Sequence, residues 1–243
     1  MKAPLAVVLL LGGLVSGSLA SAEAGVNLSW DACTSEGGIQ NKTFSCNTNS
    51  GSRVLYGSFV LAADQPNFVG VEVKVDITAQ ADSLPAWWRF AGPNTCRAAL
   101  SANFSFWSDP GISCIDPWNG QGTGNIANYF TSWTPGAGMS PNTAQVLIGG
   151  AVPSDSPISL TAGTEYYCFK LVLTSTKTVG SGACAGCSTP VCIVLSQIKA
   201  VQSDGSQETL TDPITSNVVT WQSATGCANG PKSTWGQIRA LMH

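Results

Sequence analysis

The sequence predicts an all-β protein that folds as a single antiparallel sandwich. At least seven short runs rich in β-branched and aromatic residues are separated by turn residues, and no strand–helix–strand alternation is present. Only 10% of the residues are charged, against about 25% in an average domain. A hydrophobic fraction of 44% and a net charge of −3 exclude a disordered chain.

Residues 1–22 are predicted to be a secretory signal peptide. Lys2 precedes an apolar run from Leu5 to Leu14, and small residues up to Ala22 suit a signal peptidase, with cleavage after Ala24 as the alternative. The run is too short to span a bilayer, and no later stretch approaches about 20 apolar residues. We therefore expect a mature protein without a transmembrane segment, secreted to the extracellular space or cell surface, with the periplasm as another destination.

The predicted sandwich domain covers residues 23–230. Its first half contains a short alternating run, Val26–Trp30, and two strands, Val54–Ala62 and Val69–Thr78. In the second of these strands Val and Ile alternate with Glu, Lys and Asp, which is typical of a strand with one buried and one solvated face. Turn residues from Asp64 to Asn67 separate the two strands.

Four further strands are predicted in the second half of the domain. They are Ala144–Ile148, Thr164–Thr174, Val191–Val201 and Asn217–Gln222. A hairpin-type turn follows the third of them at Ser203–Ser206.

Residues 231–243 are predicted to form a short amphipathic C-terminal helix. Thr234 and Gln237 make a capping-box pair at its start. Apolar residues repeat at helical spacing, namely Trp235, Ile238, Leu241 and Met242. We expect this helix to pack on the domain or to serve as a contact.

Nine cysteines in an exported chain predict four disulfides and one free thiol. Cys33 with Cys46 and Cys96 with Cys114 are the predicted local pairs, each contributing roughly 3 kcal/mol in the chain-entropy model. Cys168 lies inside a strand pattern and is expected to stay free. The connectivity of a second group stays open: Cys184, Cys187, Cys192 and Cys227. This group could also bind zinc or act as a redox pair, but export favours disulfides.

The stretch from Leu84 to Trp133 concentrates the large side chains, with five of the eight Trp. Within it we expect a strand at Ala99–Phe106 and a short helix at Ile126–Ser132. Exposed rings could stack on sugars, whereas buried rings would brace the core and the loop. If the segment of Trp87 and Trp88 is a strand, their side chains point to opposite faces, so at least one of them should be partly exposed. The residues predicted to contact a ligand are Trp87, Trp88, Trp107, Trp118, Tyr129 and Trp133.

Two resemblances accompany these patterns. The Gly-led run Gly163–Leu173, the strand Ile193–Ala200 and the Asp204-Gly205 turn resemble the second half of cohesin-type and carbohydrate-binding-module-like jelly-roll domains, and Val71–Ile77 would suit the first half. This resemblance implies a jelly-roll or cohesin-like sandwich. Cohesins are poor in disulfides and lack a Trp-rich insertion, so dockerin binding is not implied. The CAGC cluster and the Thr234–Leu241 segment resemble exported bacterial proteins of unassigned role.

The residue types present restrict the chemistry. The only histidine is His243, the last residue, which excludes nucleophiles activated by His and zinc catalysis by His ligands. Asp109 and Asp116 could act as the carboxylate pair of a glycoside hydrolase, but both also start ordinary Asp-Pro turns. A calcium site at Asp116 is a further alternative. The Gly-rich run Asn119–Asn125 does not match a phosphate loop.

These observations predict an exported, disulfide-stabilised, non-enzymatic binding or structural module that uses no cofactor. Its expected partner is a polysaccharide or a cell-surface protein, and nucleic acid is not expected because the chain has no basic patch. The alternatives are an envelope or extracellular structural protein that contacts only protein, and a glycoside hydrolase using Asp109 and Asp116.

Overall fold

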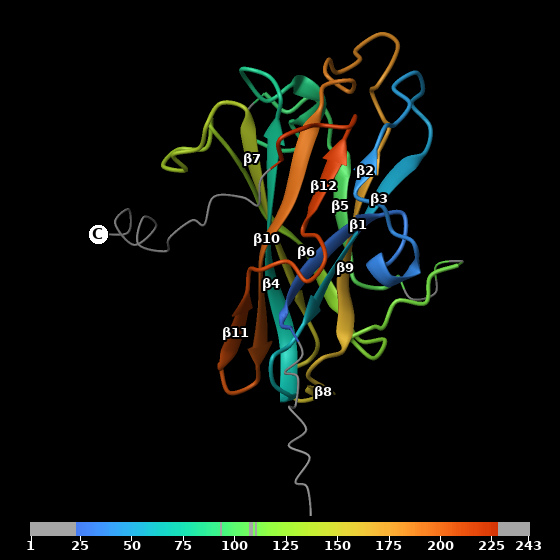
Figure 1. Ribbon diagram of the computed structural model, residues 1–243. Helices are drawn as coiled ribbons and strands as arrows, with labels where there is room; N and C mark the ends of the chain where they lie inside the picture. Colours follow the sequence, from blue (N-terminus) through green and yellow to red (C-terminus); the bar gives the residue numbers. More distant parts are fainter. Residues whose placement is uncertain (1–22, 93, 107–108, 110, 228–243) are drawn as a thin grey trace, which may run out of the picture.

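The computed structural model describes residues 23–92, 94–106, 109 and 111–227, in which two sheets pack face to face (Figure 1). The predicted all-β sandwich is therefore confirmed, and this part of the chain contains no α-helix, only 3₁₀ turns at Thr34–Glu36 and Ala86–Trp88. None of its helical segments is long and apolar enough to cross a membrane. The predicted signal peptide (1–22) and C-terminal helix (231–243) lie outside the described residues.

The smaller sheet has four strands. In spatial order they are β1 (Gly25–Trp30), β3 (Ser52–Val60), β9 (Glu165–Thr174) and β5 (Leu100–Asn103). All neighbouring pairs are antiparallel.

The larger sheet has eight strands. The main path is β2 (Asn41–Lys42), β12 (Val218–Trp221), β10 (Val191–Gln202), β4 (Gln65–Ala79), β7 (Thr143–Ala151) and β6 (Thr123–Thr131). Beside this path, β11 (Gln207–Leu210) pairs with β10, and β8 (Ile158–Leu160) pairs with β4. The pairing is antiparallel except between β2 and β12.

The alternating sequence of β4 explains its central place in the larger sheet. Val71, Val73, Val75 and Ile77 are all buried in the core, while Glu72 and Thr78 on the opposite face are exposed. Strand β10 runs antiparallel beside it, with Ile193 opposite Ile77. Both strands were predicted, and the structure extends β4 toward its N-terminus through the expected turn.

The helix expected at Ile126–Ser132 is wrong, because this segment is the edge strand β6. Ile126 lies opposite Ile148 and Tyr129 opposite Val146 on β7. A β-bulge between these pairs adds one residue to β6, so Ile126 and Tyr129 are spaced by three positions instead of two. That spacing imitates a helical period, which explains the wrong prediction.

The four disulfides are Cys33–Cys114, Cys46–Cys187, Cys96–Cys184 and Cys192–Cys227, and Cys168 is a buried free thiol. The predicted local pairs Cys33–Cys46 and Cys96–Cys114 are therefore wrong. The cause is that the Trp-rich stretch from Leu84 to Trp133 folds back over the smaller sheet.

The fold-back is visible in the packing around Cys114. This cysteine lies with Tyr56, Phe106 and Tyr167 in a cluster separate from the main core. Leu55, the neighbour of Tyr56 on β3, belongs to the main core, so the second cluster occupies the other face of the sheet. Cys33 at the end of β1 meets Cys114 there, 81 residues away in sequence.

Thiol counting tests this connectivity. The denatured, unreduced protein should show one reactive thiol, from Cys168, and a Cys46→Ser/Cys187→Ser double variant should also show one. A Cys33→Ser/Cys46→Ser double variant should show three, because Cys114 and Cys187 lose their partners. A count of one in this last variant would contradict these disulfides and support the local pair Cys33–Cys46.

The two sheets meet closely at Gly150. A Cβ atom at Gly150 would fall within the Phe104 ring, whereas a Cβ atom at neighbouring Gly149 would meet nothing within 4 Å. We expect Gly150→Ala to lower the free energy of unfolding by about 1–3 kcal/mol through overpacking. Gly149→Ala is the matched control and should be neutral or slightly stabilising. Equal effects of the two variants in urea unfolding would contradict the packing described here.

Candidate functional site

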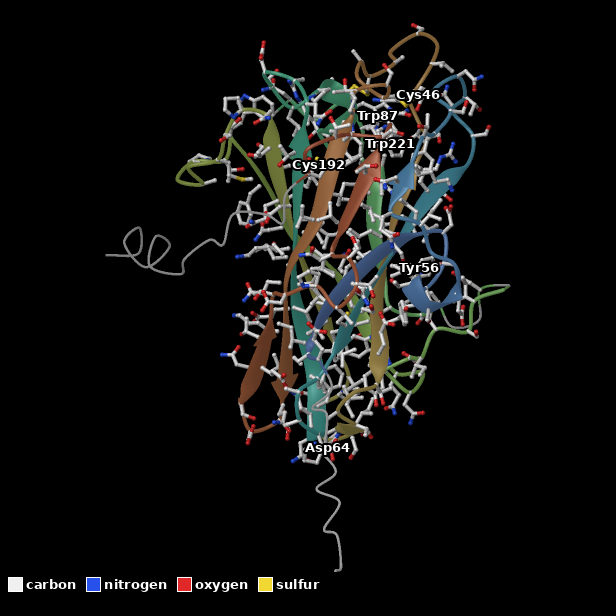
Figure 2. The ribbon with its side chains drawn as sticks, viewed as in Figure 1. Cys46, Tyr56, Asp64, Trp87, Cys192 and Trp221 are labelled. Atoms are coloured by element: carbon white, nitrogen blue, oxygen red, sulfur yellow. A yellow bond between two sulfur atoms is a disulfide. The ribbon has the colours of Figure 1, made fainter. Side chains whose placement is uncertain are left out.

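Two adjacent members of the predicted contact set, Trp87 and Trp88, are core residues. Their side chains are only 1% and 0% exposed. The segment is a 3₁₀ turn and not a strand, so both rings turn inward and pack on Trp221 with centroid distances of 4.9 and 5.3 Å. Figure 2 shows Trp87 and Trp221 side by side at one end of the sandwich, close to Cys46. The prediction that one of the pair is exposed is therefore wrong.

Trp118 is also buried, with an exposure of 0%. Its indole N–H donates to the carbonyl of Cys168 at 2.9 Å, and its ring packs against Phe68 and Phe104. It therefore fills the space between the sheets and is not a contact residue. Trp107 lies outside the described residues.

The two aspartates considered for catalysis have structural partners. The carboxylate of Asp116 accepts hydrogen bonds from the backbone N–H groups of Trp118 and Gly120, at 2.9 and 3.0 Å. Asp109 forms an ion pair with Lys170. Asp116 thus caps its own turn, as Asp residues commonly do, and among the described residues no cluster of metal-ligand type includes it.

The structure also contradicts the zinc alternative for the second cysteine group. Cys184, Cys187, Cys192 and Cys227 are all in disulfides, and three different bonds contain them. Where the chain is described, Cys33, Glu36 and Cys114 form the one other cluster of metal-ligand type. Two of its members are joined by a disulfide, and Glu36 accepts hydrogen bonds from Ser113.

Tyr129 and Trp133, the remaining predicted contact residues, line a common surface hollow of about 540 Å³. Both side chains are partly exposed. The hollow lies along β6 and the turn that follows it, and the segment after Trp88 closes one side. The other lining residues are Ala91, Gly92, Ile126, Ala127, Asn128, Phe130, Thr134 and Pro135.

Tyr129 is anchored at its hydroxyl, which donates a hydrogen bond to the backbone carbonyl of Trp88. The ring meets Phe90 edge-on, with centroids 5.7 Å apart. Burial of the hydroxyl raises the pKa of Tyr129, and a backbone hydrogen bond at Phe90 and the positive charge of Arg89 oppose this only in part. The hollow therefore rests on the same aromatic core that holds Trp88.

Trp133 is braced on one face of its ring by Arg89, a residue that the sequence analysis did not single out. The guanidinium carbon lies 4.3 Å from the ring centroid, and the Arg89 Nε donates to the carbonyl of Leu84 at 2.9 Å. The tight turn below the ring is fixed by the Thr134 hydroxyl, which accepts from the Thr131 N–H at 3.0 Å. The sequence does contain a signal for Arg89, because it directly follows Trp87 and Trp88 and arginine side chains often pack on Trp rings.

Comparison with known proteins shows similarity of fold alone. No protein-family model and no curated protein sequence matches this chain. The sixth cohesin of scaffoldin B from Acetivibrio cellulolyticus, solved in complex with a Cel5 dockerin, is 11% identical with a TM-score of 0.34, over 82% of this chain and 99% of the cohesin. A cohesin module of a Clostridium perfringens family 33 glycoside hydrolase is 9% identical with a TM-score of 0.33, over 82% and 94%. The structure is thus distantly similar to cohesin modules, as the sequence pattern indicated.

The anchoring of Tyr129 predicts a pH dependence of stability. An unfolded tyrosine ionises near pH 10, whereas Tyr129 with its raised pKa stays protonated in the folded protein. Ionisation above about pH 10 therefore favours the unfolded state, and stability should fall as the pH rises. Tyr129→Phe should reduce this fall, by up to about 1.4 kcal/mol per pH unit. An unchanged slope in urea unfolding between pH 9.5 and 11 would contradict the burial of the hydroxyl.

Proposed function

We propose that this protein is an exported, non-enzymatic binding module that contacts a carbohydrate through the hollow of Tyr129 and Trp133. Four disulfides in a chain of low charge support export, since such bonds persist in oxidising compartments. The observation that carries the proposal is the pair of partly exposed aromatic rings in one hollow.

The size and lining of the hollow support a small sugar unit as ligand. A volume of about 540 Å³ falls within the range of about 300–1,000 Å³ typical of ligand pockets. Aromatic rings offer apolar faces to the C–H groups of a sugar, and the exposed Asn128 amide offers a donor and an acceptor for its hydroxyls. The hydrogen bond of the Tyr129 hydroxyl and the contact of Arg89 with Trp133 hold both rings before a ligand arrives, which reduces the ordering cost of binding.

The same lining supports binding in preference to catalysis. The described residues that line the hollow include no carboxylate, histidine or cysteine. Glycoside hydrolysis needs two carboxyl groups about 5–9.5 Å apart beside the scissile bond. The hydrolase alternative therefore has no support at this site.

A protein partner is the second candidate, favoured by the position of β6 at the end of its sheet. This strand ends the path of the larger sheet and pairs only with β7 among the described strands. Its nine residues include neither a charged residue nor a proline, the usual features that protect an edge from pairing with another chain. An extended segment of a partner could add to this edge.

Depletion by insoluble polysaccharides, followed by Trp fluorescence titration with soluble fragments, tests the proposal. We expect Trp133→Ala to weaken carbohydrate binding at least tenfold, which corresponds to a loss of about 1.4 kcal/mol. Ile115→Ala is the control, because Ile115 is a 53% exposed apolar residue that does not line the hollow. Binding that survives Trp133→Ala unchanged would place the site elsewhere. Absence of binding to any polysaccharide would favour the protein partner.

A further inference from the structure

We infer that the ligand of the hollow is an acidic carbohydrate whose carboxylate is bound by the guanidinium of Arg89. This inference rests on the proposed function and deepens it, since it names the ligand's charge and the residue that recognises it. Four observations carry it: the partners of Arg89, its fixed orientation, its position beside Trp133, and the absence of acidic residues around the hollow.

The first observation is that Arg89 has no acidic partner. The ion pairs among the described residues use Lys42, Lys170 and Lys199. The Nε of Arg89 is bonded to the Leu84 carbonyl, but no described group accepts a hydrogen bond from its two terminal nitrogens. Arg97 differs: it is 2% exposed and donates to backbone carbonyls of Trp87 and of the β9 end. Arg97 is therefore a core residue, whereas Arg89 is partly exposed and its two terminal nitrogens have no acceptor among the described residues.

The second observation is that the Arg89 guanidinium is oriented in advance. Its Nε bond to the Leu84 carbonyl and its contact with the Trp133 ring fix the group from two directions. The two terminal nitrogens of a fixed guanidinium match the two oxygens of a carboxylate in a bidentate pair. Because the side chain is already ordered, such a pair forms with little further loss of conformational freedom.

The third observation is the shared position of Arg89 and the hollow. Ala91 and Gly92, which directly follow this segment, line the hollow, as does Trp133, on whose ring Arg89 lies. Arg89 does not itself line the hollow, but its guanidinium carbon lies 4.3 Å from the centroid of the Trp133 ring, so a sugar that stacks on this ring has the cation as a near neighbour. A uronic acid, which carries a carboxylate on its ring, offers the apolar face and the charge within one unit.

The fourth observation is the charge of the surroundings. The ten described residues that line the hollow are uncharged, so an entering carboxylate meets no acidic group among them. The whole chain carries a net charge of −3, so an anion is not attracted by the protein in general. Preference for an acidic sugar must then depend on Arg89 and should disappear with it.

A pair of matched ligands tests this inference on the oxidised mature protein. Oligogalacturonate and its methyl ester share the same sugar chain, but the ester lacks the negative charge. We expect the wild-type protein to bind the acid at least tenfold more tightly than the ester, and to lose affinity for the acid alone between 50 and 500 mM NaCl. Arg89→Gln should remove the preference, and Arg89→Lys should restore it only in part because a lysine cannot form the bidentate pair.

Arg53→Gln is the matched control. Arg53 is also a partly exposed arginine over an aromatic ring, 5.3 Å from the centroid of Phe44, but it lies on β3 of the smaller sheet. This variant loses the same charge and the same type of stacking, so it should keep the wild-type preference. Melting temperatures of both variants report any general loss of structure.

The outcomes separate the inference from the proposed function. Equal binding of the acid and the ester by the wild type, or a preference that persists in Arg89→Gln, overturns the inference and leaves carbohydrate binding intact. A sulfated polysaccharide that binds as tightly as the polyuronate overturns the assignment of a carboxylate. No binding of galacturonate, mannuronate or glucuronate oligomers, charged or esterified, overturns the inference, and the proposed function falls with it only if neutral polysaccharides are not bound either.

Discussion

The end of the sandwich that contains Trp87, Trp88 and Trp221 depends on the turn from Cys184 to Cys187. The two cysteines of this turn form disulfides with Cys96 and Cys46, which belong to segments far apart in the sequence. The turn also accepts hydrogen bonds from the backbone N–H of Trp87, through the Ala185 carbonyl, and from the indole of Trp221, through the Cys187 carbonyl. Covalent and hydrogen bonds thus converge on four residues. They hold the Trp-rich segment inside the protein, where the sequence alone leaves core and surface as open alternatives.

The buried aromatic cluster in turn supports the surface hollow. The guanidinium carbon of Arg97 lies 3.2 Å from the Trp87 ring centroid, and its Nε donates a hydrogen bond to the Trp87 carbonyl. Arg97 therefore stabilises the 3₁₀ turn Ala86–Trp88 from the core side. The next carbonyl, that of Trp88, accepts a hydrogen bond from the Tyr129 hydroxyl. One residue further, Arg89 lies on Trp133. Three consecutive residues therefore connect the disulfide-bonded turn to both exposed rings, which places the proposed site on a rigid base and not on a free loop.

The sequence predicts the sandwich well where local patterns decide and poorly where distant contacts decide. Alternation in β4 and the aromatic run of β9 identify these strands, because side-chain periodicity is local. The bulge in β6 hides its strand pattern. Disulfide pairing depends on which segments meet in three dimensions, so Cys33 could not be assigned to Cys114 from spacing. The same holds for the site: Tyr129 and Trp133 were among six candidates, and the burial that excludes Trp87, Trp88 and Trp118 is set by the tertiary fold.

Among the described Trp side chains between Leu84 and Trp133, Trp87, Trp88 and Trp118 are buried in the core and Trp133 is partly exposed. Hydrogen exchange of the indole N–H groups, followed by NMR on protein labelled at tryptophan, tests this central claim most directly. The indoles of Trp30, Trp118 and Trp221 donate to buried backbone carbonyls, so they should exchange slowly. The indole of Trp133 should exchange fast and should shift when a polyuronate oligomer is added. Fast exchange at Trp118 together with a ligand-induced shift there would contradict the account.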